Sequence, residues 1–250
     1  MQNGKINAIF DQQASSYDQK WSRLAPLNSA LHLLTEAVLS ELPPTARILC
    51  VGAGTGAEIL YLARQFPGWR FTAVEPSTAM LEVLRRRAEE QGISSRCLFH
   101  SGYLDSLPAG ESFDAATAFL VSQFITDRQA RSEFFLNISG RLRPGGILVS
   151  SDLAGDLSVA AESMDLPEVW YQVTRDSGAS PSPDGIARMR EAYTRDVAVL
   201  PPRDIRGIIM RGGFDVPVLF FQAGMIHAWY ARRSSSPTGP GKAAGTAPFH

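Results

Sequence analysis

A glycine-rich turn between a strand-like run and a helical pattern constrains this chain most. The apolar run 48–51 enters the turn Gly52–Gly56, and a helical pattern begins at Ala57. Glycines at alternate positions let the backbone bend sharply and let a ligand approach without meeting a Cβ. The start of the helix directs free N–H groups and a positive dipole end to the same place. The stretch predicts a nucleotide-like cofactor or, as the open alternative, a tight turn without a ligand.

Composition places the chain among ordinary globular proteins. Of its 250 residues, 44% are hydrophobic and 20% charged, which suits one α/β domain with an insertion. The formal net charge of −1 provides no footprint for nucleic acid. No apolar run approaches the roughly 18 residues that span a membrane, and no signal peptide is visible, so we expect a cytoplasmic protein. Cys50 and Cys97 lie in apolar runs, which favours buried thiols over a disulfide or metal site.

Hydrophobic periodicity divides the chain into alternating elements. Helical patterns cover about 6–21, 26–42, 57–66, 77–91, 127–142, 184–199 and 202–211, and strand patterns cover 47–51, 69–75, 96–100, 113–120, 147–152, 216–222 and 225–232. The central alternation predicts a parallel sheet with helices on both faces. Only Ala223-Gly224 separates the last two strands, which predicts an antiparallel hairpin.

The pattern also predicts the domain organisation. We expect a single domain over 1–233, with N-terminal helices over 1–43 and a helical insertion over 153–200. The tail 234–250 is rich in Ser, Pro, Gly and Ala and lacks apolar periodicity, so we expect it to be disordered.

Glu75 is the second residue that points to a cofactor. It ends the second predicted strand, about 20 residues after the glycine turn, where an acid can accept hydrogen bonds from both hydroxyls of a ribose. A surface acid at a strand end is the plainer alternative. These two features do not separate NAD from S-adenosylmethionine, because the turn also fits the dinucleotide fingerprint.

Several segments in order resemble the class I S-adenosylmethionine-dependent methyltransferases. The resemblance extends over about 10–232 and rests on 50–56, 71–81, 102–108, 113–120 and 142–148. It implies a Rossmann-like, seven-stranded, mostly parallel sheet with an antiparallel last strand. It also implies S-adenosylmethionine as cofactor and S-adenosylhomocysteine as product. The cofactor-binding positions carried over are Tyr17, Gly52, Ala53, Gly54, Gly56, Glu75, Pro76, Met80, Gly102, Tyr103, Leu104 and Phe119.

Two positions depart from that family's pattern. The first motif usually opens with an acid that helps to organise the methionine end of the cofactor, and Cys50 stands there in this chain. Either another group takes over that role or binding is weaker. The segment at Gly102 often carries an Asp beside the glycine, whereas Tyr103 follows here, so its ring could stack or the backbone alone could read the base.

The segment 10–18 resembles a lid helix of small-molecule methyltransferases. The resemblance places Tyr17 and Trp21 over the cofactor, while packing of the helix on the sheet is the equal alternative. Candidate bases are few. His100 and Asp152 end predicted strands near the expected cofactor edge, but each has a structural alternative: packing for His100 and helix capping for Asp152.

The substrate pocket is expected between the end of the fourth strand and the insertion. Its candidate lining residues are Gln123, Phe124, Trp170, Tyr171, Arg190 and Tyr193. Aromatic side chains there could hold a small molecule or could form the insertion's own core.

The leading hypothesis is a methyltransferase that acts on an O, N or C atom of a small-molecule acceptor, as a monomer or homodimer. The segment 119–125 and the lid are also similar to carboxy-S-adenosylmethionine synthase, which modifies the cofactor. A non-catalytic cofactor-binding protein is a third hypothesis. A nucleic-acid substrate is disfavoured by the charge balance.

Overall fold

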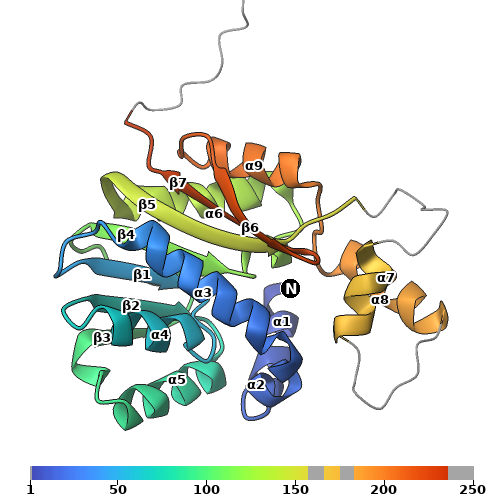
Figure 1. The fold of residues 1–250 in the computed structure, drawn as a ribbon, viewed down its shortest axis with the longest axis horizontal. Coiled ribbons are helices and arrows are strands. Elements are labelled where there is room, and N and C mark those ends of the chain that lie inside the picture. The colour runs from blue at the N-terminus through green and yellow to red at the C-terminus, as the bar shows by residue number, and fades with distance from the viewer. Residues whose placement is uncertain (1, 157–165, 175–182, 236–250) are drawn as a thin grey trace, which may run out of the picture.

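A computed structural model of the chain describes residues 2–156, 166–174 and 183–235. Its centre is a seven-stranded sheet with the strand order β3-β2-β1-β4-β5-β7-β6 (Figure 1). The strands are β1 (Arg47–Val51), β2 (Arg70–Glu75), β3 (Cys97–Ser101), β4 (Phe113–Phe119), β5 (Leu142–Leu153), β6 (Val218–Ala223) and β7 (Ile226–Arg232). The first five run parallel, and β7 runs antiparallel to both β5 and β6. The Rossmann-like sheet with a reversed last strand is confirmed.

Helices cover both faces of this sheet (Figure 1). They are α1 (Gln2–Gln13), α2 (Tyr17–Lys20), α3 (Ala25–Leu39), α4 (Ala57–Gln65), α5 (Thr78–Glu90), α6 (Arg128–Arg141), α7 (Leu166–Thr174), α8 (Pro183–Arg195) and α9 (Pro202–Arg211). On one face, α3, α4 and α5 bury apolar side chains against β1 and β2. On the other face, α6 and α9 pack on β4, β5 and β7. The parallel strands β1, β2, β4 and β5 are therefore buried from both sides over most of their length, which explains their apolar sequences, whereas β3 at the edge of the sheet is only partly buried.

The prediction of one N-terminal helix over 6–21 is wrong in extent, because a turn interrupts the helix between α1 and α2. The Ser16 N–H and hydroxyl both donate to the Gln13 carbonyl, at 3.0 and 3.5 Å. Serine often competes with the helical ladder in this way.

The helix predicted over 184–199 ends at Arg195 instead. Beyond it, the Ala198 N–H donates to the carbonyl oxygen of Gln123 at 2.7 Å, so this backbone joins the loop after β4.

β5 begins earlier than the predicted 147, because Leu142 already pairs with Phe113 before a register shift and pairing resumes at Ile147. The hairpin turn is Gly224-Met225 rather than Ala223-Gly224, because Ala223 still pairs with Ile226.

Other predictions agree closely with the structure. Ser77 caps α5, with its hydroxyl accepting from the Met80 N–H at 3.2 Å, and α9 has the predicted bounds. Most of the tail, 236–250, lies outside the described residues, as do 157–165 and 175–182 of the insertion. In the described part of the chain, every helix is too short or too polar to cross a lipid bilayer.

Candidate cofactor site

The glycine turn after β1 is locked in place by the strand beside it. The N–H groups of Gly52 and Ala53 donate to the Val74 carbonyl at 2.8 and 3.2 Å. Gly54 and Gly56 have φ values of +54° and +81°. A Cβ on Gly56 would strike Leu84, but a Cβ on Gly54 would meet nothing within 4 Å. The turn therefore packs tightly on its helix side and leaves space open at its middle glycine, as a cofactor cradle requires.

Glu75 faces this turn from the end of β2. Its side chain is only 6% exposed, and its carboxylate accepts from the Gly54 N–H at 2.9 Å and from the Ser77 N–H at 2.8 Å. Burial raises the pKa of Glu75, while these two backbone donors act in the opposite direction. Each carboxylate oxygen retains a lone pair for a further donor, such as a ribose hydroxyl.

The segment after β3 is joined to Glu75 through the backbone. The Gly102 N–H donates to the Glu75 carbonyl at 3.0 Å. Tyr103 is 41% exposed, and its hydroxyl donates to the side chain of Asn7 in α1 at 3.1 Å. His100 is hydrogen-bonded to the Ser106 hydroxyl at 2.8 Å. The Tyr103 side chain is thus accessible to solvent, whereas the His100 ring is fixed by its hydrogen bond to Ser106 in the following loop.

Other residues assigned to the cofactor contribute to packing. Leu104 is buried in the cluster under α6, and Met80 is buried against Ala14 of the segment between α1 and α2. Pro76 is half-buried directly after β2. Phe119, at the end of β4, stacks on His32 of α3 with ring centroids 6.3 Å apart.

Two aspartates attach the N-terminal helices to the framework of the site. Asp11 accepts from the Ser77 hydroxyl at 2.6 Å and from the Ala79 N–H at 3.2 Å, at the start of α5. Asp18 accepts from the Thr55 hydroxyl in the glycine turn at 2.9 Å and pairs with Arg87 of α5. Residues 11–18 therefore contact both sides of the Glu75 region.

Tyr17 lies in the same N-terminal segment. Burial, followed by the charges of Asp18 and Glu75, raises the pKa of Tyr17 to about 12. Its phenol is therefore protonated at neutral pH. Trp21, a helix turn later, packs instead with Leu24 in the cluster that includes Trp170.

Asp152 is not accessible to a substrate in this arrangement. It lies inside β5 and is fully buried, with its carboxylate 3.2 Å from the Arg131 guanidinium and accepting from the Ser122 hydroxyl at 2.7 Å. Arg131 also donates to the Ala198 carbonyl at 2.9 Å. The residue neither caps a helix nor faces the cofactor edge. Its ion pair with Arg131 joins β5, α6 and the segment before α9.

The residues assigned to the substrate pocket divide into two groups. Gln123 is buried, with its side-chain oxygen accepting from the Leu153 N–H at 2.7 Å. Phe124 packs edge-on against Phe10 of α1 at 5.5 Å. These two residues connect the end of β4 to its neighbours.

The second group comes from α7 and α8. Trp170 is buried, and its indole N–H donates to the Tyr193 hydroxyl at 3.0 Å, which fastens the two helices together. Burial raises the pKa of Tyr193. Tyr171 and Arg190 are half-buried on the same helices. Trp170 therefore packs in a buried cluster that joins the insertion to β5, β7 and the segment after α2, rather than in a core of the insertion alone.

Glu58 is the residue that sequence reasoning missed. It occupies the first turn of α4 and is only 7% exposed. Burial raises the pKa of Glu58 to about 7, with a smaller contribution from Glu75. An acid in the first turn of a helix is stabilised by the helix dipole, so the sequence alone indicates an ordinary structural role for Glu58. Only the fold shows that its side chain is buried.

The fold places an open glycine turn after β1 beside a buried acid at the end of β2, an arrangement typical of cofactor-dependent α/β enzymes. A family model described as a methyltransferase domain matches residues 48–146. This match, together with the fold, supports a class I S-adenosylmethionine-dependent methyltransferase.

Related sequences carry names from this class, and a solved structure shares the fold. A carboxy-S-adenosyl-L-methionine synthase from Campylobacter hominis is 24% identical over 217 residues, covering 85% of this chain and 89% of that protein. A demethylmenaquinone methyltransferase from Clavibacter sepedonicus is 33% identical over 149 residues, covering 58% and 57%. The structure of phosphoethanolamine N-methyltransferase 2 from Haemonchus contortus, in complex with S-adenosyl-L-methionine, has a TM-score of 0.57 and 18% identity, covering 76% of this chain and 37% of that one.

Proposed function

We propose that this chain transfers the methyl group of S-adenosylmethionine to a small-molecule acceptor. The observation that carries the proposal is the pairing of Glu75 with Gly54. A buried carboxylate is held by backbone donors beside a glycine whose open side has room for a ligand. Ribose hydroxyls would donate to the remaining lone pairs of Glu75.

Bound S-adenosylmethionine would supply a sulfonium methyl that a nucleophile attacks in line. The chain's own contribution is alignment and exclusion of water. The glycine turn would lie against the nucleoside and amino-acid parts, and Tyr17 would cover them from the N-terminal side. Residues 1–43 would then act as the lid, and the insertion 153–200 would border the acceptor. A cytoplasmic location and a monomeric or homodimeric state belong to the same proposal.

Calorimetric titration tests the cofactor assignment. We expect S-adenosylhomocysteine to bind to the protein and NAD not to bind. Glu75→Ala should weaken S-adenosylhomocysteine binding by roughly 10- to 100-fold, because hydrogen bonds to a charged group are lost. Glu89→Ala, an exposed acid of α5, is the matched control and should change nothing. Tight NAD binding, or unchanged affinity in Glu75→Ala, would contradict the proposal.

The coverage of the relatives supports a second candidate function. Relatives named carboxy-S-adenosyl-L-methionine synthase align with 81–85% of this chain, whereas the methyltransferase from Clavibacter sepedonicus aligns with 58%. Mass spectrometry of the nucleoside that co-purifies with the protein separates the two candidates. A carboxylated form of S-adenosylmethionine would favour the second, and unmodified S-adenosylmethionine or S-adenosylhomocysteine the first.

A further inference from the structure

The outward side of α3 lacks the charged residues that a helix usually presents to water. The helix has no lysine or arginine, and the carboxylate of its one acid, Glu36, accepts from the Tyr61 hydroxyl of α4 at 2.6 Å. The exposed positions of α3 are Ala25, Pro26, Ser29, Leu33, Leu34 and Ala37. A helix that is apolar on all sides is normally covered on all sides, so this outward side indicates a missing partner.

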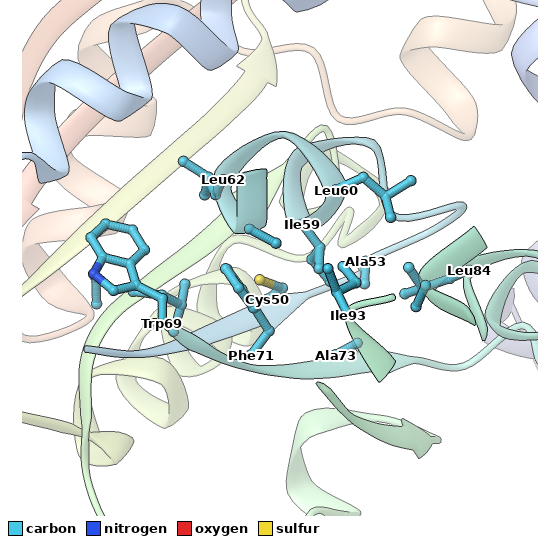
Figure 2. Packing of buried hydrophobic residues seen from close by; sticks show 14 of the residues in the cluster. Cys50, Ala53, Ile59, Leu60, Leu62, Trp69, Phe71, Ala73, Leu84 and Ile93 are labelled. Atoms are coloured by element: carbon cyan, nitrogen blue, oxygen red, sulfur yellow. The ribbon is translucent and has the colours of Figure 1, made fainter. Parts of the chain in front are cut away.

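The other sides of α3 are already occupied. Leu39 is fully buried in the apolar cluster that also contains Cys50 and Phe71 (Figure 2). On the side towards α4, the His32 ring packs on Tyr61 with ring centroids 5.5 Å apart. Leu34 lies two residues beyond His32, which is about 200° around a helix. It therefore lies on the opposite side of α3, towards β6, which α3 also contacts.

β6 is an edge strand that is open on one side. Among the described strands it pairs with β7 alone, so one row of its backbone N–H and C=O groups has no partner in the sheet. Pro217 precedes the strand, but 218–223 contains no charged residue. Val218 and Leu219 are 46% and 44% exposed. Native proteins usually protect such an edge with charge or a covering element.

The opposite edge of the sheet has this protection. Arg85 of α5 places its guanidinium 4.7 Å from the centre of the Phe99 ring of β3 and donates to the Phe99 carbonyl at 3.5 Å. Leu98 of β3 is 55% exposed, so exposure of an apolar side chain alone does not distinguish the two edges. What distinguishes β6 is an uncharged, uncovered strand beside an apolar helix face.

We propose that a second copy of this chain covers the α3–β6 surface in a two-fold symmetric dimer. The α3–β6 surface consists of Leu33, Leu34, Val216, Val218 and Leu219. β6 pairs antiparallel with the same strand of the second copy, which continues the sheet across the axis. The two α3 helices then lie antiparallel on the same face of the joined sheet. The inference does not rest on the proposed function, because it involves no contact with a cofactor.

The chemistry of the surface favours a second copy over other partners. A strand edge is self-complementary in an antiparallel two-fold pairing, whereas a lipid surface offers no backbone partner. Arg23 and Glu41, both exposed, precede and follow α3, so antiparallel helices bring Arg23 of one copy towards Glu41 of the other. The tail 236–250 contains three prolines and only one large apolar residue, Phe249, so its composition suits neither the strand edge nor the leucines.

The size of the surface also fits a dimer. Its five apolar side chains are 38–58% exposed. Together they offer on the order of 400 Å², about half of the roughly 800 Å² that one partner buries in a stable interface. The strand edge and the small residues Ser29 and Ala37 extend the surface.

Sedimentation velocity of the full chain over a dilution series tests the inference. We expect a species of twice the 27.2 kDa chain mass that dissociates on dilution. Val218→Lys and Leu33→Lys should each raise the dimer dissociation constant by about 100-fold or more, because each places a charge in an apolar interface. The matched controls are Leu98→Lys on the edge strand β3 and Leu136→Lys on α6. These leucines are 55% and 51% exposed, and both variants should dimerise like the parent.

A charge exchange tests the antiparallel arrangement. Arg23→Glu should weaken the dimer by roughly 5-fold, because exposed ion pairs contribute little. Adding Glu41→Arg to the same chain should restore the parent dissociation constant, and failure to restore it would overturn this arrangement.

The remaining outcomes overturn the inference in distinct ways. A parent that sediments as a monomer at every concentration excludes the dimer and leaves the tail or another protein to cover the surface. A dimer that survives both Val218→Lys and Leu33→Lys uses a different face, and an equal loss in the Leu98→Lys and Leu136→Lys controls shows an effect of charge at any position. Thermal unfolding establishes that each variant is folded. S-adenosylhomocysteine binding by the parent tests the proposed function separately.

Discussion

Replacing Glu58 by glutamine should stabilise the ligand-free protein, and the gain should depend on pH. The folded state raises the pKa of this carboxyl from 4.5 to about 7, chiefly through burial. A difference of that size corresponds to about 3 kcal/mol between folded and unfolded protein. Glutamine has nearly the same shape and no charge, so the variant does not have this free-energy cost of ionising a buried carboxyl.

The direction in which this stability difference changes with pH follows from the raised pKa of Glu58. At low pH, Glu58 is protonated in both states and ionisation has no cost. As the pH rises above 4.5, the unfolded chain ionises this carboxyl freely, while the folded chain resists ionisation until the pH passes about 7. Wild-type stability relative to Glu58→Gln should therefore fall by up to about 3 kcal/mol between about pH 4 and about pH 8, and change little above that.

Urea unfolding at several pH values, for both proteins, measures this difference. Glu90→Gln should show no comparable pH dependence, because Glu90 is exposed. An identical difference in unfolding free energy at every pH would refute the reasoning. So would a Glu58→Gln variant that is less stable than the parent at the high-pH end.

Three further changes probe the surrounding framework. Asp152→Asn should cost about 3 kcal/mol or more, because it leaves the fully buried Arg131 uncompensated; S-adenosylhomocysteine affinity should be unchanged, and an intact stability in urea would contradict the structural role. Gly54→Ala and Gly92→Ala both place a Cβ at positive φ in open space, so each should lose about 1 kcal/mol of stability, but only Gly54→Ala should weaken cofactor binding by calorimetry. Asp18→Asn should increase hydrogen exchange over residues 2–20 and lower affinity by no more than about 5-fold, since the pair is partly exposed.

Sequence reasoning worked where local signals determined the outcome. Alternating apolar runs and glycine turns located the strands, and Ser77 and α9 followed from capping and periodicity. The position of Glu75 also followed, because its spacing from the glycine turn is a property of one strand–helix–strand unit. These features depend on short stretches of the chain, so they can be predicted without knowledge of the tertiary packing.

Prediction from the sequence failed where residues that are far apart in the chain contact each other in the fold. The burial of Asp152 depends on Arg131, which belongs to another helix. Tyr103 finds its partner Asn7 at a separation of 96 residues. Glu58 resembles an ordinary acid at a helix start in the sequence, but the packing of the fold leaves it only 7% exposed. No local pattern encodes which long-range neighbour removes a charged group from water.

The attachment of residues 11–18 to Ser77 and Thr55 has a kinetic consequence. The same two aspartates contact the glycine turn and the start of α5, the elements proposed to hold the cofactor. On that placement, exchange of S-adenosylhomocysteine for a fresh cofactor requires these contacts to open first. The residence time of the product, rather than the chemical step, would then set the pace of turnover.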